Sequence, residues 1–474
     1  MTDIKEIISL LHEPTEKDKE LVQKACDFAL RAHADQKRLS GEPYFNHVFA
    51  TAKNIAELGM DATTVSAGFL HDVVEDAGVK PEDLEKEFGS EIRFLVEGVT
   101  KLGKIKYQGT SRYNESLRKF FIAVSQDIRV LIIKLCDRLH NIQTLQYVRP
   151  EKQLRIAKET LEIYAPLAYR LGIKKLQRNL EDTSFAYVYP EESEKIKKLL
   201  NVRKEEQEKL LHEFQKSLKK ELAKNGIVEF RIDHRVKSLY SLYKKLQKYD
   251  WNVENIYDIS ALRITVKEVQ DCYRVLGIIH GSWRPLPGRI KDYIATPKLN
   301  GYRSIHTTVF SGDGGIIEVQ IRTEEMDKEA EFGIASHISY KEGKKSGSAN
   351  QNLLWIKNLA KYNKESGDEF LADIKTDFFE ERIFLFTPKG DVIDLPAGSS
   401  AVDFAYNIHS DIGNHMSGVK INNKFVALDT ALQSGDLVEI ETKKSAKPSH
   451  KWLEYCKTTI AKRHIRNALE NRKN

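Results

Sequence analysis

The apolar pattern of this chain changes near residue 226, and the change limits the folds that its 474 residues can adopt. Before that point, apolar residues recur at helical spacing in segment after segment; from Ile128 to Leu145 they keep one continuous stripe, which predicts a helix starting near Asp127. From Ile227 to about Tyr340, short alternating runs follow helical ones. Neither an all-helical bundle nor a lone sheet accommodates both patterns. The sequence therefore predicts a multidomain α+β protein.

The same patterns divide the chain into six segments. The predicted segments are an all-α domain over 1–190, charged connecting helices over 191–225, a mixed α/β domain over 226–345, a linker and helix over 346–378, a small domain opened by a hairpin over 379–443, and a basic helical tail over 444–474. We interpret the stretch over 191–225 as a solvated connection between two domains. In the small domain, Ser400 and Asp403 resemble a capping box that opens a helix through His409.

Composition narrows the class of protein. No run of residues approaches the ~18 uncharged apolar residues of a membrane span. The first residues lack the apolar core of a secretion signal, so we expect a cytoplasmic protein without a membrane partner. The four cysteines are scattered, which excludes a cysteine zinc site. A net charge of +6 is modest for this length, and we expect no DNA partner.

Residues 71–76 read His-Asp-Val-Val-Glu-Asp and concentrate four ionisable side chains. On a helix, Glu75 would lie at i+4 from His71, and Asp76 at i+4 from Asp72. Apolar and small residues precede the run, so its carboxylates are expected to be partly buried and to need a partner. The simplest partner is a divalent metal ion.

Two further segments strengthen that interpretation. His47 is expected early on a helix, and Asp137 and Asn141 share one face of an otherwise apolar helix. Taken alone, Asp137 is better explained by an ion pair with Arg138 or a neighbour. Together, two imidazoles and two carboxylates suit Mn²⁺ or a similar ion better than closed tetrahedral zinc.

A second candidate site lies in the mixed domain. The run from Ile317 to Arg322 alternates, which places Glu318, Gln320 and Arg322 on one side of a strand. An ordinary half-exposed strand would give the same pattern. Asp258 opens another predicted strand, and two carboxylates from adjacent strands can hold Mg²⁺ on a triphosphate while one of them acts as a base.

A loop rich in Gly and Pro over 287–306 connects these carboxylates. Its charged residues are four cations and one acid, Arg289, Lys291, Lys298, Arg303 and Asp292. That balance suits a polyphosphate, and Tyr302 is available to stack on a base. Upstream, Lys237, Ser241 and Lys245 recur at i+4 steps; a solvated basic face is the alternative explanation. There is no Walker-type glycine loop.

Long motifs carry a resemblance to a known family. They are RLSGEPYFNH (38–47), HDVVED (71–76), KLCDRLHN (134–141), YAPLAYRLGI (164–173), PGRIKDYIATPKLNGYRSIHTTV (287–309), EVQIRT (318–323) and FTPKGDVIDLPAGSSAVDFAYNIHSDIGN (386–414). Over nearly its whole length the chain resembles the bifunctional Rel/Spo alarmone synthetase/hydrolase family. The resemblance implies an HD-type helical domain, a nucleotidyltransferase-like synthetase domain and a small β-grasp domain called TGS.

The resemblance also implies two opposed reactions. The synthetase would move pyrophosphate from ATP to the 3′-oxygen of GTP or GDP, giving (p)ppGpp, with Mg²⁺ on Asp258 and Glu318 and with Glu318 activating the hydroxyl. The hydrolase would remove the 3′-pyrophosphate of (p)ppGpp, with Glu75 and Asp76 driving the water. Its Mn²⁺ ligands would be His47, His71, Asp72 and Asp137.

Nucleotide contacts follow from the same resemblance. In the hydrolase they would be Arg38, Ser40, Asn141 and Thr144. In the synthetase, ATP would contact Arg235, Lys237, Ser241 and Lys245; the guanine nucleotide would contact Lys298, Asn300, Tyr302 and His306; and Arg289, Lys291, Gln320 and Arg322 complete the predicted site. The run from Arg289 to Asp292 fits the basic version of a family signature, which favours a bifunctional enzyme. Leu39 and Val48 depart from the family at positions where a basic residue and proline are usual.

Two alternatives stay open at this point. One is a hydrolase whose synthetase half only binds nucleotide; the other is a non-catalytic binder of the ribosome or uncharged tRNA that uses the TGS module, His409 and the basic tail. Long family members continue into regulatory modules beyond TGS, so a shortened form of the family is expected. Opposed reactions in one chain further imply coupling between the sites, for which the helix over 191–225 is the expected conduit.

Overall fold

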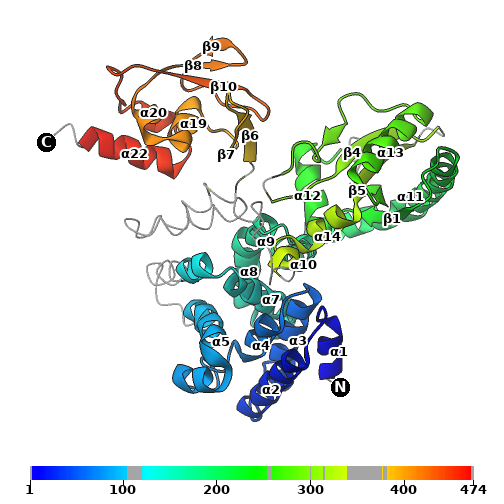
Figure 1. Ribbon diagram of the computed structural model, residues 1–474, viewed down its shortest axis with the longest axis vertical. Helices are drawn as coiled ribbons and strands as arrows, with labels where there is room; N and C mark the ends of the chain where they lie inside the picture. The colour runs from blue at the N-terminus through cyan, green and yellow to red at the C-terminus, as the bar shows by residue number, and fades with distance from the viewer. Residues whose placement is uncertain are drawn as a thin grey trace. The chain divides into compact units, whose positions relative to one another are not determined.

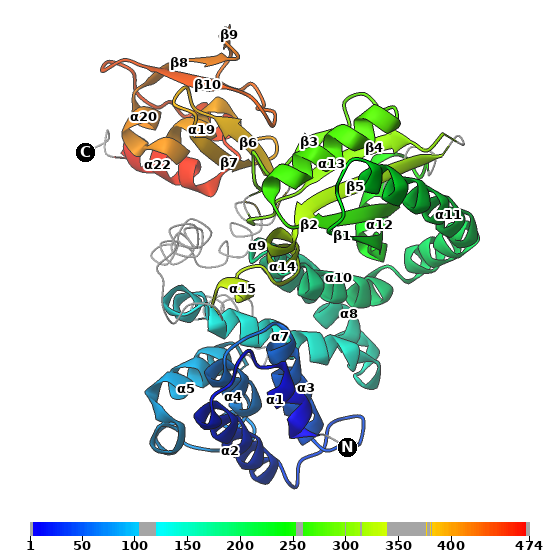
Figure 2. The same ribbon diagram turned by 45° about the vertical axis from the view of Figure 1, so that its right-hand side comes forward.

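The computed structural model describes residues 3–103, 120–252, 259–298, 300–312, 315–338, 376, 380 and 382–470. Contacts divide the chain into two compact units: the first comprises Met1–Lys106 and Ser116–Ala360, and the second comprises Tyr107–Glu115 and Lys361–Asn474. Figure 1 and Figure 2 show helices and a five-stranded sheet in the first unit, and small sheets with short helices in the second. The predicted multidomain α+β class is confirmed.

The first unit begins with the predicted all-α part. Its elements are α1 (Ile4–Leu10), α2 (Glu16–Ala32), α3 (Phe45–Glu57), α4 (Ala62–Leu70), α5 (Pro81–Gly103), α7 (Arg129–Gln143), η1 (Leu145–Tyr147), α8 (Pro150–Glu159), η2 (Thr160–Tyr164), α9 (Ala165–Arg170) and α10 (Lys174–Val188). The backbone N–H of Arg129 donates to Asp127 Oδ1 at 2.9 Å, so the acid starts α7 as expected. One prediction is wrong: α4 ends at Leu70, and residues 71–76 form turns. A hydrogen bond from Asp76 N to Asp72 O (2.8 Å) keeps these acids near one another.

The charged stretch after residue 190 forms one long helix, α11 (Pro190–Lys224). Its apolar residues Phe214, Leu218 and Leu222 are buried against the five-stranded sheet, and Ile196 packs in a second cluster with Phe185 and Leu242. The expectation of a solvated connection is therefore wrong. The helix contributes to the apolar core of the domain that follows it.

That domain is built on a sheet with strand order β1-β2-β5-β4-β3. The strands are β1 (Phe230–Val236), β2 (Ser260–Val266), β3 (Lys291–Asp292), β4 (Ile305–Phe310) and β5 (Ile316–Thr323); β2 and β5 are parallel, and the other neighbours are antiparallel. Helices α12 (Leu239–Lys248), α13 (Val269–Ser282), α14 (Glu324–Phe332) and α15 (Ala335–Ile338) accompany it. Side chains of α11 and α13 cover one face of the sheet, where Ile317, Val319 and Ile321 are buried. The predicted alternation of β5 follows, since Glu318 and Gln320 point to the other face.

The second unit contains the predicted hairpin and the small helices. Its elements are β6 (Arg382–Phe386), β7 (Val392–Pro396), α19 (Ala401–Ile408), α20 (Ser410–Asn414), β8 (Met416–Ile421), β9 (Lys424–Val426), β10 (Val438–Thr442), α21 (Trp452–Tyr455) and α22 (Thr459–Glu470). The capping box of Ser400 and Asp403 is confirmed. The tail packs on this fold, because Trp452 and Ile465 share an apolar cluster with Tyr406.

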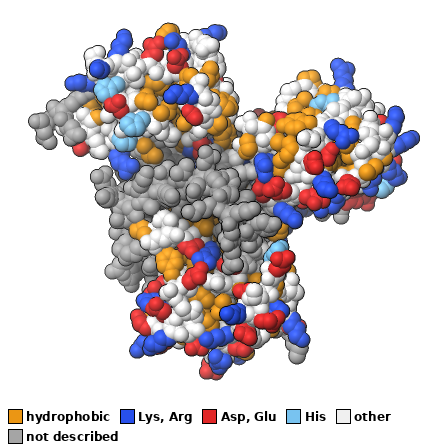
Figure 3. All heavy atoms as spheres, in the orientation of Figure 1, with side chains coloured by type: hydrophobic (Ala, Val, Ile, Leu, Met, Phe, Trp, Pro, Cys, Tyr) orange, Lys and Arg blue, Asp and Glu red, His pale blue; other side chains and the backbone are white. Residues whose placement is uncertain are grey.

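Charged side chains of both signs are spread over the face of the molecule in view (Figure 3). Figure 3 shows acidic and basic side chains interspersed over the described parts of the face in view. Among the described residues, no helix has the combination of length and apolar character that crossing a bilayer requires.

Candidate active sites

Three buried side chains from separate parts of the helical bundle meet in the first unit. His47 is the third residue of α3, His71 follows α4, and Asp137 lies within α7. Their possible ligand atoms all lie within 4.8 Å of one another. His47 Nε2 is 3.2 Å from Asp137 Oδ1, and Asp72 Oδ2 lies 3.1 Å from His71 Nε2. The four residues predicted as metal ligands are therefore brought together.

His71 tests whether a metal ion fits this cluster. Its Nδ1 lies 2.8 Å from the carbonyl oxygen of Gly68, which can only accept, so Nδ1 carries a proton and Nε2 faces the acids. That Nε2 is buried and, among the described residues, makes no hydrogen bond. Burial alone would lower the pKa of His71, yet Asp72 and Asp137 raise it to about 10. The position requires a positive charge, and a divalent ion supplies it.

His140 sets the orientation of the other imidazole and was missed by the sequence analysis. Its Nδ1 lies 3.0 Å from Arg38 Nη1 and 2.9 Å from His47 Nδ1. An arginine only donates, so His140 Nδ1 accepts and His47 Nδ1 must carry a proton. The lone pair of His47 Nε2 is thereby left toward Asp137. Burial, followed by the charges of His47 and Arg38, lowers the pKa of His140 to about 3, which keeps it an acceptor.

The acids next to the cluster differ in environment. Glu75 is half-buried, and burial together with the nearby Asp72 raises its pKa to about 7. Asp76 is exposed, and Tyr44 Oη lies 2.7 Å from an oxygen of each of Asp72 and Asp76. Burial would raise the pKa of Asp137, but Lys134 Nζ at 2.7 Å, with His47 and His71, holds it well below its usual value. Glu75 is thus the acid suited to exchange a proton near neutral pH.

A pocket of about 420 Å³ adjoins this cluster. It is lined by all four predicted nucleotide contacts of the hydrolase, Arg38, Ser40, Asn141 and Thr144, together with Asp137 and the exposed Leu39. Arg38 Nη2 donates to Asn141 Oδ1 at 2.5 Å, and Asn141 Nδ2 donates to Asp137 Oδ1 at 2.5 Å. Hydrogen bonds therefore connect the pocket wall to the metal cluster.

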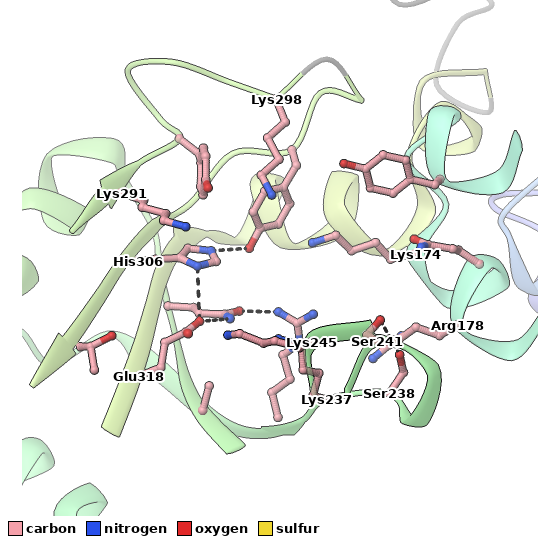
Figure 4. A pocket seen from close by; sticks show the side chains of 18 of the residues that line it. Lys174, Arg178, Lys237, Ser238, Ser241, Lys245, Lys291, Lys298, His306 and Glu318 are labelled. Atoms are coloured by element: carbon pink, nitrogen blue, oxygen red, sulfur yellow. Dashed lines mark hydrogen bonds and ion pairs between the residues drawn. The ribbon is translucent and has the colours of Figure 1, made fainter. Parts of the chain in front are cut away.

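A second pocket of about 330 Å³ lies on the open face of the five-stranded sheet (Figure 4). Glu318 Oε1 lies 3.3 Å from His306 Nδ1 and accepts a hydrogen bond of 2.7 Å from Gln320 Nε2. Arg235 Nη1 donates to Gln320 Oε1 at 2.8 Å, and Tyr302 Oη lies 2.9 Å from His306 Nε2. Neighbouring strands and the loop before β4 thus hold the Glu318 carboxylate in one orientation.

Cations dominate the lining of this pocket. The predicted residues that line it are Arg235, Lys237, Ser241, Lys245, Arg289, Lys291, Lys298, Tyr302, His306, Glu318 and Gln320. Glu318 is the one carboxylate among the described lining residues. Burial, followed by the charges of Lys291 and Arg235, lowers the pKa of Lys298 to about 8. A site of this composition favours a polyphosphate.

Two of the predicted residues that the structure describes, Asn300 and Arg322, do not line the pocket. Asp258 lies outside the described residues. Asn300 Nδ2 donates instead to the carbonyl oxygen of Tyr169 at 3.3 Å, and Arg322 is buried in an ion pair with Asp327.

Four lining residues come from helices that precede α11 and were not predicted. They are Tyr169, Lys174, Gln177 and Arg178, from α9 and α10. Their signal in the sequence is weak: the motif over 164–173 ends where α10 begins, but a distant contact with the sheet cannot be deduced from spacing. Tyr302 is only 3% exposed, and the Lys174 ammonium lies 3.2 Å from the centre of its ring.

Comparisons with known proteins divide the chain into three matched regions. Residues 25–174 match the HD domain, 234–345 match the region found in RelA/SpoT proteins, and 383–442 match the TGS domain. The HD match implies divalent metal binding, in keeping with the cluster of His47, His71 and Asp137.

Relatives match almost all of this chain. A guanosine-3′,5′-bis(diphosphate) 3′-pyrophosphohydrolase of Aquifex aeolicus is 44% identical over 99% of this chain and 66% of its own length, and a GTP pyrophosphokinase of Myxococcus xanthus is 43% identical over 97% and 62%. The chain thus spans somewhat less than two thirds of these relatives. The small alarmone synthetase 2 of Bacillus subtilis is 29% identical over 38% of this chain and 97% of its own, with a TM-score of 0.25 that adds nothing to the fold assignment. With an HD domain, a RelA/SpoT region and a TGS domain in that order, the chain belongs to the RelA/SpoT family.

Proposed function

We propose that this chain is a bifunctional alarmone enzyme that both makes and hydrolyses (p)ppGpp. The observation that carries the proposal is the presence of two separate polar sites in the first unit, an acidic imidazole cluster beside one pocket and a cation-rich pocket around a single described carboxylate. The first composition suits metal-assisted hydrolysis, and the second suits transfer between two polyphosphates. The names of relatives support both reactions.

In the hydrolase, His47, His71, Asp72 and Asp137 would hold a divalent ion, for which we propose Mn²⁺. Such an ion supplies Lewis acidity and makes a water molecule more acidic. Glu75 takes a proton from the attacking water, because burial and the nearby Asp72, which raise its pKa to about 7 in the metal-free protein, make it a stronger base than an exposed carboxylate. The water oxygen bonds to the phosphorus attached to the 3′-oxygen, and the bond between that phosphorus and the 3′-oxygen breaks. The 3′-oxygen takes up the proton that Glu75 received, and pyrophosphate and GDP or GTP are released. Arg38, Ser40, Asn141 and Thr144 hold the nucleotide.

Asp76 is exposed, unlike the half-buried Glu75. We propose that it orients the water, while Tyr44, 2.7 Å from both Asp72 and Asp76, fixes the spacing of the two carboxylates.

In the synthetase, Glu318 accepts the proton of the 3′-hydroxyl of GTP or GDP. The freed oxygen attacks the β-phosphorus of ATP, and AMP leaves. His306, 3.3 Å from Glu318, positions the carboxylate, and the surrounding lysines and arginines neutralise the transferred charge. We propose Mg²⁺ as the accompanying ion, with Glu318 and Asp258 as its carboxylate ligands.

A paired assay tests the proposal. Glu318→Gln is expected to abolish synthesis of ppGpp from ATP and GDP while leaving hydrolysis of ppGpp intact, and Asp72→Ala is expected to do the reverse. If each variant kept both reactions, the two site assignments would be wrong. A wild-type chain that bound ATP and GDP yet made no ppGpp would instead be a hydrolase with a regulatory nucleotide-binding half.

Binding of uncharged tRNA or the ribosome is a separate proposal for the second unit. His409 is exposed, and its Nδ1 accepts from Asp411 N at 3.2 Å, which holds the ring at the start of α20. Filter binding of uncharged tRNA to wild type and to His409→Ala tests it. Equal retention of tRNA by both would remove His409 from the proposal.

A further inference from the structure

The turn between α9 and α10 is in close backbone contact with the sheet domain. Gly172 has φ +75°, and a Cβ there would lie 2.8 Å from the Asn300 carbonyl oxygen. Gly333 has φ +55° and meets the same turn, so that a Cβ would clash with the Leu171 carbonyl oxygen. The backbone N–H of Ile334 donates to that oxygen at 2.9 Å. We call this contact of Leu171 and Gly172 with Asn300, Gly333 and Ile334 the junction; it fixes the position at which α10 begins.

Lys174 is the first residue of α10, and the junction directs it into the pocket of the sheet domain. Figure 4 shows Lys174 and Arg178 entering the pocket opposite His306 and Glu318. Lys174 is half-buried, and its ammonium lies over the ring of Tyr302, 3.2 Å from its centre. An aromatic face is a weak partner for an ammonium group.

The acid that acts on the charge of Lys174 is Glu331, whose effect is smaller than that of the surrounding cations. Among the described residues, its ammonium makes no hydrogen bond or ion pair, whereas Arg178 on the next turn pairs with Glu331 at 2.9 Å. Burial, followed by the charges of Arg235, Arg322 and Lys298, holds the pKa of Lys174 well below its usual value. An ammonium group surrounded by other cations is strongly stabilised when an anion binds beside it.

We propose that Lys174 binds the phosphates of the guanine nucleotide in the synthetase pocket, and that it leaves the face of Tyr302 when the base stacks there. The inference rests on the proposed synthetase function. An ammonium and a base cannot occupy the same face of the ring, and the flexible four-carbon stem of lysine allows the ammonium to move. A residue from the α9–α10 segment, in the helical part that carries the metal cluster, therefore completes the nucleotide site on the sheet.

Lys174→Met tests the role of the charge while keeping the length of the side chain. We measure the Kd of GTP and of guanosine by competition with a fluorescent GTP analogue. Loss of a charged hydrogen bond predicts that GTP binds about tenfold or more weakly, whereas guanosine, which has no phosphate, binds equally well or more tightly. Lys174→Arg is expected to restore most of the affinity for GTP.

Lys175→Met is the matched control. Lys175 lies on the same turn, its Nζ pairs with Glu57 at 2.8 Å, and it does not line the pocket. Its affinity for GTP should equal that of wild type. Hydrolysis of ppGpp by Lys174→Met, measured on the same preparation, should stay within about twofold of wild type and reports that the chain is folded.

Three outcomes overturn the inference. The first is a GTP affinity that Lys174→Met leaves unchanged. The second is a loss of affinity by the same factor for GTP and for guanosine, which would assign Lys174 to packing on Tyr302. A wild-type chain that binds no GTP overturns both this inference and the proposed synthetase. A chain that binds GTP through Lys174 but makes no ppGpp overturns the proposed synthetase alone.

Discussion

His140 Nδ1 lies 2.9 Å from His47 Nδ1, although 93 residues separate the two in the chain. This contact turns the lone pair of His47 Nε2 toward Asp137 and Asp72. Arg38 donates to the same Nδ1 of His140 at 3.0 Å, so this nitrogen acts as an acceptor. We therefore regard His140 as a positioning residue for the metal cluster.

Replacing His140 should weaken metal binding. Loss of such a supporting contact typically lowers affinity by about 10- to 100-fold, so His140→Ala should raise the Kd of Mn²⁺ by that factor in calorimetry. His140→Gln keeps an acceptor and should recover part of the affinity, and His12→Ala, on the surface, should have no effect. Equal Mn²⁺ affinity in His140→Ala and wild type would show that the contact does not orient His47.

Hydrolysis should depend on pH through Glu75. A base must be deprotonated to accept a proton, so the rate of ppGpp hydrolysis should rise as pH increases through about 7 and then level off. Glu75→Gln should remove this rise and lower the rate by about 10²- to 10⁴-fold. A wild-type profile that is flat from pH 5.5 to 8.5 would assign the proton transfer to another group.

The same raised pKa has a cost in stability. The folded, metal-free protein keeps the Glu75 proton up to about pH 7, whereas the unfolded chain releases it near 4.5. The stabilising contribution of Glu75 is therefore complete below pH 4.5 and is lost as pH rises to about 7. Tm of Glu75→Gln relative to wild type should increase over that window in thermal melts with a chelator, and a constant difference would contradict the assignment.

Gly172→Ala should destabilise the first unit and impair synthesis. A left-handed backbone costs a non-glycine residue about 1–2 kcal/mol, and the contact with Asn300 adds a steric cost. Gly226→Ala is the control, since Gly226 has φ +76° but no atom within 4 Å of a Cβ. Urea unfolding should show a larger loss for Gly172→Ala. Equal losses would mean that the junction yields to the added methyl group.

Asp403 should be essential to the second unit. Its buried carboxylate accepts from Ser400 N at 2.8 Å, from Thr458 N at 2.8 Å and from Thr458 Oγ1 at 2.7 Å. Asp403→Ala leaves these donors without their partner, at a cost of about 3 kcal/mol or more. Hydrogen exchange in α22 should accelerate, while exchange in α3 should not. Unchanged exchange in α22 would show that apolar packing alone holds the tail.

Local patterns predicted the fold and the metal cluster because their signals are short in range. The alternation of β5 and the capping box at Ser400 needed only neighbouring residues. Residues 71–76 were wrongly expected to be helical, since i+4 spacing of charges does not ensure a continuous series of i→i+4 backbone hydrogen bonds. Asp76 N bonds Asp72 O in this way, but the segment as a whole forms turns.

Other features depended on distant contacts. The apolar residues of α11 at 211, 214, 218 and 222 do follow helical spacing, but the surrounding charges concealed it. The roles of His140 and Lys174 depend on contacts with His47 and Tyr302, which lie 93 and 128 positions away in the chain. Spacing along the chain contains no information about such pairs.

The side chains that α10 adds to the sheet pocket determine which segment of the chain could be transferred as a functional unit. In the linear sequence, residues 226–345 resemble an independent domain. However, four residues that line its pocket precede residue 226, namely Tyr169, Lys174, Gln177 and Arg178. A fragment beginning at residue 226 would also lose Phe214, Leu218 and Leu222, and it would expose the apolar face of the sheet to water. The smallest piece that could be transplanted with its pocket intact must begin before α9. Recombination between relatives would therefore have to keep the segment from α9 through the sheet together.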